Sequence, residues 1–231
     1  AYDFRLSLVG SEMCIRDRAL RAEKSIGSSL SCSPEAMKPL PTFRPGTSAL
    51  TSMSAWPATA PRSLTAVAHT LHALVNLGAD NCWQVYQKYL YQHQPLTGLW
   101  ASEPPHISPQ YATAQIMIAL LDSGAQAAIP AMCQALAMYR HSNGAWGVGD
   151  GCTEETAYAV LALLAAKRHR CLPDQLAPAL LKAKRWMCDH YRPFEEQGLP
   201  LWRGKQLYRP IRIARMVELT ALIGLLHAVD A

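Results

Sequence analysis

The sequence predicts an all-α protein, part of an α/α barrel or toroid that is built from repeated helical hairpins. A turn of the form glycine, any residue, tryptophan occurs at Gly98 and Trp100 and again at Gly144 and Trp146. Each turn precedes an alanine-rich apolar segment with Thr-Ala near its start, and repetition at roughly forty to fifty residues is typical of units that stack on copies of themselves. Phe is scarce and runs of β-branched residues are absent, so a sheet is not expected.

Four segments are predicted to be inner helices of this barrel. They are rich in Ala and Leu and carry few charges, as expected of helices that are buried on nearly all sides. They comprise residues 65–77, 113–121, 156–166 and 211–229.

The segments between them are predicted to be outer helices. They mix apolar residues with Lys, Arg, Gln and His at helical spacing, which is typical of a helix with one solvated face. These segments are residues 81–93, 129–141 and 175–191.

The beginning of the chain is predicted to lie outside this fold. Residues 1–18 include EMCIRDR, which resembles a translated sequencing adapter, and are excluded from the fold on that ground. Residues 19–62 are rich in Ser and Pro without hydrophobic periodicity, which fits a natural linker or a reading-frame error upstream of Leu64. We therefore expect the domain to span residues 63–231.

Composition argues against two classes of function. The net charge is +5, but the basic residues are scattered and form no stripe interleaved with aromatic residues, so nucleic-acid binding is not expected. No run approaches the roughly twenty apolar residues of a membrane span. The seven cysteines show no paired spacing, which favours reduced thiols and a soluble, cytoplasmic protein.

Three segments in order carry a family resemblance: PHISPQYATAQIMIAL from residue 105, NGAWGVGDGCTEETAYAVLALL from 143, and LPLWRGKQLYRPIRIARMVELTAL from 199. Together they resemble the C-terminal part of bacterial class II terpene cyclases, most closely the diterpene cyclases that make copalyl-type diphosphates. The resemblance covers nearly all of residues 63–231, and squalene-hopene cyclases are similar more distantly.

The resemblance implies an isomerase that cyclises geranylgeranyl diphosphate by protonation, in a cavity between this barrel and a second one. Such chemistry needs a protonated carboxylic acid and a dry cavity whose aromatic faces stabilise the carbocation. The family retains the diphosphate, and Mg²⁺ assists its binding. The family's acid is an Asp-x-Asp-Asp motif placed before the region preserved here, and this sequence has none. The chain is therefore expected to be a fragment, inactive by itself.

The candidate site residues follow from the matched segments. His106, in a loop before an inner helix, is a candidate to accept or relay a proton. Tyr111 is expected to line the substrate pocket, although Gln110 replaces the first Tyr of the family pattern His-x-Ser-Pro-Tyr-Tyr. Further candidates for contact with the substrate are Trp146, Trp202, Tyr208 and the cationic Lys205.

Structural roles are the simpler explanation for several of these residues. Trp100 and Trp146 are expected mainly to pack against helix ends. Thr153 is predicted to be an N-cap, with Glu154 and Glu155 in the first helical turn or near the cavity. His69 and His72 lie three residues apart, but without a third ligand nearby no metal site is expected.

Other functions remain open from the sequence. One is a triterpene cyclase of the squalene-hopene type, and another is a non-enzymatic helical-repeat module that binds a partner. A prenyltransferase β-subunit-like barrel would need a zinc site of Asp, Cys and His, for which no suitable segment is present.

Overall fold

The computed structural model describes residues 63–78, 83–195, 198–203 and 207–229. The suspected adapter and the Ser/Pro-rich segment, residues 1–62, lie outside the described residues. All described helices belong to one compact unit. They are α3 (Leu64–Asn76), α4 (Gln84–Gln92), α5 (Pro109–Asp122), α6 (Ile129–Met138), α7 (Thr153–Arg168), α8 (Ala177–His190), which follows a short 3₁₀ helix (Asp174–Leu176), and α9 (Ile211–Val229).

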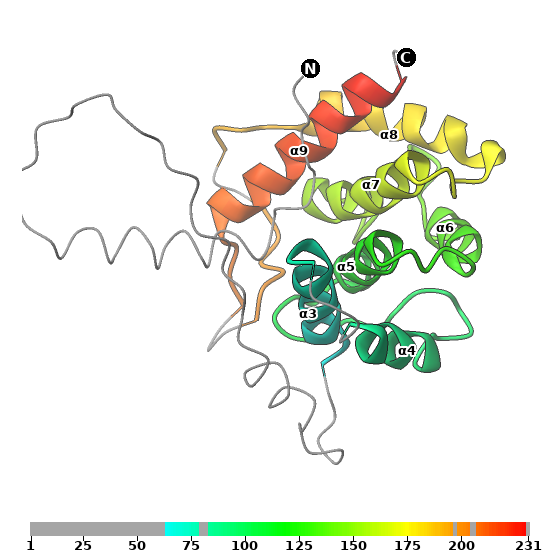
Figure 1. The fold of residues 1–231 in the computed structure, drawn as a ribbon. Helices are drawn as coiled ribbons and strands as arrows, with labels where there is room; N and C mark the ends of the chain where they lie inside the picture. Colours follow the sequence, from blue (N-terminus) through cyan, green and yellow to red (C-terminus); the bar gives the residue numbers. More distant parts are fainter. Residues whose placement is uncertain (1–62, 79–82, 196–197, 204–206, 230–231) are drawn as a thin grey trace, which may run out of the picture. The chain divides into compact units, whose positions relative to one another are not determined.

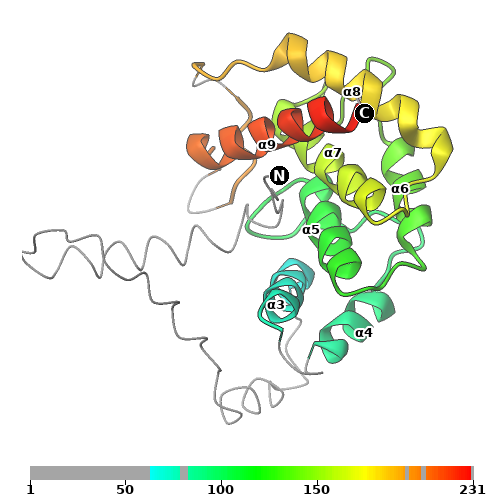
Figure 2. The same ribbon diagram turned by 45° about the horizontal axis from the view of Figure 1, so that its top comes forward.

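The four inner helices form a row in the order of the sequence. α3 packs on α5, α5 on α7, and α7 on α9. In Figure 1 the outer helices α4 and α6 lie to the right of this row, and α8 lies above α7. α4 packs on α3, α6 packs on α5 and α7, and α8 packs on α7 and α9. Figure 2 gives a second view of the same order. This arrangement and the comparisons reported below confirm the predicted α/α barrel fold.

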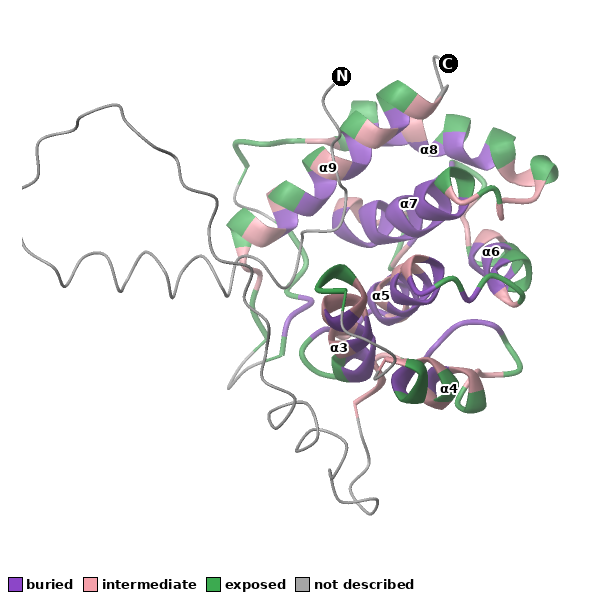
Figure 3. Ribbon diagram, viewed as in Figure 1, coloured by how far each residue is buried: buried purple, intermediate pink, exposed green. Residues whose placement is uncertain are grey.

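Burial separates α5 and α7 from the outer helices as the sequence predicted. The prediction of burial on nearly all sides is wrong for α3 and α9, which are buried on one side only because each has a described inner helix on one side alone. In α7, every residue from Glu154 to Ala166 is buried, because neighbours cover this helix on all sides. α4 buries only Tyr86 and Leu90, and its other residues are exposed or half-buried. Figure 3 shows this contrast as nearly continuous purple on α5 and α7 against mixed colours on the outer helices.

Local sequence sets the start of some helices. Ser108 caps α5 by accepting a hydrogen bond from the backbone N–H of Gln110, and Pro109 begins the helix with its φ already suitable. In α8, Pro178 lies in the first turn, so the predicted segment 175–191 divides into a 3₁₀ turn and a helix.

The predicted cap of α7 is wrong in detail. Cys152 is the N-cap and makes no side-chain cap bond, while Thr153 is the first helical residue. The Thr153 hydroxyl instead donates to Glu218 Oε1 of α9 over 2.6 Å. A tertiary partner has therefore replaced the local cap.

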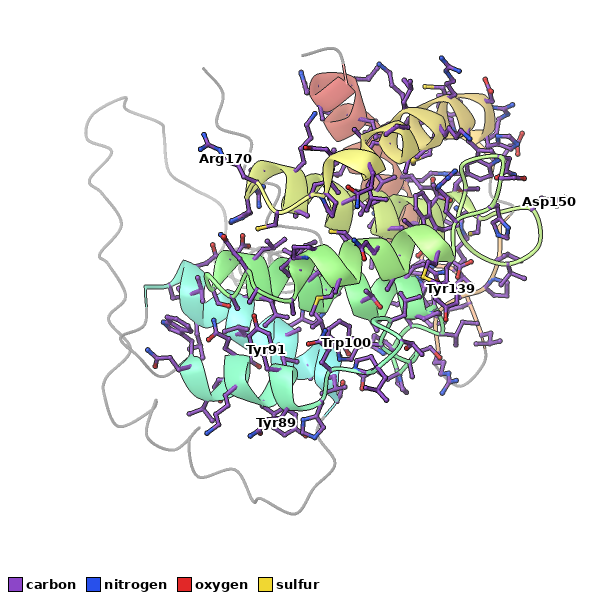
Figure 4. The ribbon with its side chains drawn as sticks, turned by 90° about the vertical axis from the view of Figure 1, so that its right-hand side faces the viewer. Tyr89, Tyr91, Trp100, Tyr139, Asp150 and Arg170 are labelled. Atoms are coloured by element: carbon purple, nitrogen blue, oxygen red, sulfur yellow. The ribbon has the colours of Figure 1, made fainter. Side chains whose placement is uncertain are left out.

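The repeated tryptophan turns attach each loop to the next inner helix. The backbone N–H of Trp100 donates to Thr113 Oγ1 (3.0 Å), and that of Trp146 donates to Thr156 Oγ1 (2.9 Å). Both threonines belong to the Thr-Ala pairs that the sequence repeats. Figure 4 shows Trp100 within the packed part of the molecule and Asp150 at its outer edge. The repeated motif is therefore a loop-to-helix hydrogen bond.

Candidate functional site

The N-terminal ends of the four inner helices meet at one set of buried polar and aromatic side chains. Glu103, in the loop before α5, accepts hydrogen bonds from the backbone N–H groups of Leu64 and Thr65 at the start of α3. The same loop pairs with the segment before α9, since Ile107 N–H donates to the Leu201 carbonyl. Two loops thus bring together residues that lie far apart in the sequence.

Four rings make up what we call the aromatic cluster: His106, Tyr111, Tyr158 and Trp202. The imidazole of His106 stacks on Tyr111 with ring centroids 4.7 Å apart, and meets the rings of Tyr158 and Trp202 edge to face at 5.4 and 5.0 Å. The rings of Tyr111 and Tyr158 also meet edge to face, at 5.0 Å. All four side chains are buried, so the cluster is a dry, aromatic region.

Both nitrogens of His106 have partners. Nδ1 accepts a hydrogen bond from the Ser108 backbone N–H (3.0 Å), so the ring proton belongs on Nε2. Nε2 lies 3.4 Å from Glu154 Oε1, to which it donates. This geometry favours a structural, positioning role for His106. The expectation that it takes up a proton itself stays a prediction.

A buried carboxylate network supports the cluster from α7 and α9. Glu154 Oε1 also accepts from Trp202 Nε1 (2.8 Å), and Arg209 Nε lies 3.8 Å from Glu154 Oε2. Arg209 Nη2 reaches Glu218 Oε1 at 2.9 Å, and Arg215 Nη1 reaches Glu218 Oε2 at 2.8 Å. Two buried glutamates thus balance two arginines, as buried charges require.

Burial changes the acidity of the two tyrosines in the cluster. It raises the pKa of Tyr111 to about 12, with a smaller contribution from Glu103. The pKa of Tyr158 is also raised well above its usual value, mainly by burial and then by the charge of Glu154. Both phenols therefore keep their protons near neutral pH.

The other residues singled out from the sequence lie in different surroundings. Trp146 is fully buried and donates its ring N–H to the Leu136 carbonyl (2.7 Å), which favours a packing role. Tyr208 exchanges backbone hydrogen bonds with Trp202, but its side chain is 48% exposed and lies outside the aromatic cluster. Lys205 lies outside the described residues.

Glu154 and Glu155 are more buried than a simple first-turn role requires. Both are in the first turn of α7, where the helix dipole favours acids. Glu155 Oε2 accepts the backbone N–H of Val148, and Glu154 joins the network described above. The sequence had left open that Glu154 lies near the cavity, and its contacts with the aromatic cluster fit that alternative.

Sequence reasoning did not single out Glu218, Arg209 or Tyr158. Glu218 carried a signal, because a lone acid within the apolar helix 211–229 can be buried only with partners. Arg209 and Tyr158 carried none, since their roles depend on contacts between distant segments.

No described group of three or more His, Cys, Asp or Glu side chains could hold a metal ion. No described helix combines the length and hydrophobicity that a membrane span requires.

Comparison with known proteins finds diterpene diphosphate synthases among the relatives of this chain. No family model matches the chain. The (+)-kolavenyl diphosphate synthase of Herpetosiphon aurantiacus is 34% identical over 165 residues, which is 70% of this chain and 31% of that protein. The ent-copalyl diphosphate synthase of Streptomyces sp. KO-3988 is 32% identical over 146 residues, 62% of this chain and 28% of that one.

A solved structure agrees with these relatives. The ent-copalyl diphosphate synthase from Streptomyces platensis matches with a TM-score of 0.63 and 28% identity, covering 76% of this chain and 35% of that chain. This chain therefore spans about a third of the length of the relatives it matches.

Proposed function

In sequence and in fold the chain is like the class II diterpene cyclases, and on that premise we propose that it forms part of an enzyme that cyclises geranylgeranyl diphosphate to a copalyl-type diphosphate. The reaction begins with protonation of the polyene and proceeds through carbocations. The diphosphate is retained, so the enzyme is an isomerase.

The aromatic cluster is the observation that carries this proposal. A carbocation needs neighbours that stabilise positive charge without attacking it, and the faces of Tyr and Trp rings provide this in a region without water. Tyr111, Tyr158 and Trp202 supply three such rings in one buried place. Because the pKa values of both tyrosines are raised, neither ring presents a phenolate that could attack the cation.

The carboxylate network holds these rings in position. Glu154 fixes the indole of Trp202 through its ring N–H and the imidazole of His106 through Nε2. Arg209 and Arg215 neutralise the two glutamates, so the network places no net charge beside the rings. Because these hydrogen bonds hold the rings of Trp202 and His106 in fixed orientations, the aromatic surface that would stabilise the cation keeps one shape.

We include Mg²⁺ as an aid to diphosphate binding only because the related family uses it. The described residues do not fit a magnesium site, because no three described His, Cys, Asp or Glu side chains are arranged to hold a metal ion and arginines already engage Glu218 and Glu154. No step of the mechanism is therefore assigned to the metal in this part of the chain.

The decisive experiment starts from the gene. The source locus should be sequenced through the region upstream of residue 63, and the protein encoded by the complete gene should be assayed with geranylgeranyl diphosphate and Mg²⁺. We expect a bicyclic diphosphate, detected as its alcohol by gas chromatography and mass spectrometry after phosphatase treatment. Squalene, offered in parallel, tests a triterpene cyclase.

Two results would contradict the proposal. Conversion of squalene without conversion of geranylgeranyl diphosphate would assign the protein to triterpene chemistry. A complete gene that encodes no acid motif, and whose product converts neither substrate, would favour a helical binding module.

A further inference from the structure

A line of titratable side chains leads from the aromatic cluster towards the surface along α3. It begins at Tyr111, continues through His69 and His72 of α3, and ends at Asp122 and His169, at the C-terminal ends of α5 and α7. The aromatic chemistry proposed above does not use the histidines of this line.

The inner end of the line is a contact between a phenol and an imidazole. Tyr111 Oη lies 3.3 Å from His69 Nε2. Burial, and then the nearby His72, lower the pKa of His69, so this imidazole is neutral near pH 7. Tyr111 keeps its proton because its pKa is raised to about 12. The phenol is therefore the donor, and Nε2 of His69 is the acceptor.

The outer end of the line is increasingly open to solvent. His72 follows His69 by three residues and so lies on the same side of α3. Its Nε2 is 2.9 Å from Asp122 Oδ2, and His169 Nε2 is 3.3 Å from Asp122 Oδ1. The side chains of His72, Asp122 and His169 are 12%, 16% and 24% exposed in that order.

His106 does not offer the same route. It also contacts Tyr111, but through its ring face, and both of its nitrogens have partners. Of the two described histidines beside Tyr111, only His69 contacts the hydroxyl.

We propose that Tyr111 and His69 form a proton relay, which takes up the proton released at the end of cyclisation and passes it towards the surface along α3. This inference rests on the proposed function. A C–H bond next to the cationic carbon breaks and its electron pair forms the C=C bond. The proton goes to Tyr111 Oη as the phenol proton moves to His69 Nε2. The resulting imidazolium then releases its Nδ1 proton to solvent, with His72 and Asp122 beside its path.

Other charged groups around the relay help to set its pH dependence. From the loop before α5, Glu103 acts on Tyr111, and at the outer end Arg168 of α7 lies 3.5 Å from Asp122 Oδ1. α4 also packs on α3, and its only charged residue, Lys88, is exposed. Burial alone would raise the pKa of Asp122, but its contact with His72 and the nearby Arg168 and His169 lower it.

The test uses the protein from the complete gene with the variants Tyr111→Phe and His69→Gln. Each should lower kcat about 100-fold, because assisted proton transfer typically contributes 10²–10⁴-fold, while KM changes by less than about threefold. The double variant should be no slower than the single ones, since both act in one path. The limb of the kcat–pH profile that reports the base should disappear, and the hydroxylated share of the product should rise as water captures the longer-lived cation.

The matched control is His93→Gln, on the exposed end of α4, whose imidazole hydrogen-bonds the Tyr89 carbonyl and packs on the Tyr89 ring of its own helix. Its kcat and pH profile should equal those of the wild type. The relay would be overturned if the wild type is active and both His69→Gln and Tyr111→Phe are equally active with the same pH profile. An inactive wild type would instead overturn the proposed function, and the relay with it.

A second measurement depends on no activity. In this chain, the His69 pKa can be followed by NMR titration, with His69→Gln used to assign the signal. A donor to the neutral imidazole lowers its pKa, so Tyr111→Phe should raise it and His93→Gln should leave it unchanged. An unchanged His69 pKa in Tyr111→Phe would show that the contact does not exist, and would overturn the relay.

Discussion

At the scale of single residues, the fold depends on a few buried carboxylates that pair with arginines. Glu218 is the strongest case, because it is completely buried and accepts bonds from Thr153, Arg209 and Arg215. These donors come from α7, from the loop before α9 and from α9 itself. One carboxylate therefore joins three segments of the chain.

Replacing Glu218 by Gln should strongly destabilise the chain. The amide keeps the shape but removes the carboxylate charge that Arg209 and Arg215 share, and breaking a buried pair costs about 3–5 kcal/mol. Urea unfolding followed by circular dichroism measures this cost. The control is Glu195→Gln, an exposed residue for which a change within about 0.5 kcal/mol is expected. Equal stabilities of the two variants would contradict the role of Glu218.

Asp122 gives a prediction for pH dependence. Burial alone would raise its pKa, but bonding to His72 and the charges of His72, Arg168 and His169 outweigh this and lower it. A carboxyl with a lowered folded-state pKa stabilises the fold above its unfolded-state pKa of about 3.9, and this contribution is lost as pH falls through the folded-state pKa.

Asp122→Asn should therefore cost on the order of 1 kcal/mol at pH 7 and nothing once the wild-type carboxyl is protonated. Unfolding free energies measured from pH 7 down to pH 3 test this, with the exposed Asp189→Asn as the control. A stability difference that stayed constant over this range would show that the charge of Asp122 is not the cause.

At the scale of elements, glycines let the tryptophan turns approach the outer helices closely. Gly98 has φ +76°, and a Cβ there would lie 2.6 Å from Ala135 Cβ of α6. Gly124, after α5, has nearly the same φ of +79° with nothing within 4 Å of the added Cβ. Comparing alanine substitutions at Gly98 and Gly124 therefore separates the free-energy cost of a positive φ, which both share, from the cost of crowding, which only Gly98 has.

Gly98→Ala should be less stable than Gly124→Ala by about 1–3 kcal/mol, the usual cost of overpacking. Both variants bear a similar conformational cost, of about 1–2 kcal/mol. Thermal and urea unfolding of the two variants beside the wild type measure the difference. If the two variants were equally stable, the turn would not need to lie as close to α6 as the structure has it.

At the scale of the whole molecule, none of the helices that the structure describes packs on one face of α9. α9 packs on α7 and α8 with one side, while large apolar side chains on the opposite side are exposed: Met216, Leu219, Ile223 and Leu226. They follow a spacing of three and four residues, so they form one stripe. α5 and α7, by contrast, each have an inner helix on both sides.

This stripe should make the chain bind hydrophobic dyes and associate at high concentration. The double variant Leu219→Gln and Ile223→Gln should reduce both, with a loss of stability below about 1 kcal/mol because both side chains are already exposed. Dye fluorescence and sedimentation velocity measure the effect. The control is Leu96→Gln, which alters an exposed leucine outside the stripe. Equal association of the double variant and the control would contradict this role of α9.

The sequence by itself determined the helices and their order. Apolar periodicity and capping residues act within a few turns of chain, so the inner and outer helices could be predicted to within a few residues, and the fold class was confirmed. Local signals also placed Glu154 at the start of α7, whereas the predicted helix 113–121 left out Tyr111, which lies in the first turn of α5.

Only the tertiary structure decided what these residues do. In the folded chain, Trp202 and Arg209 contact Glu154. Thr153 bonds Glu218 of α9 and does not cap α7, and His69 contacts the Tyr111 hydroxyl. These contacts span up to 96 residues of separation along the chain, such as that between the bridged residues His106 and Trp202. Such partners cannot be predicted from local periodicity, because the pairing of a buried charge depends on which residues lie near it in the folded chain.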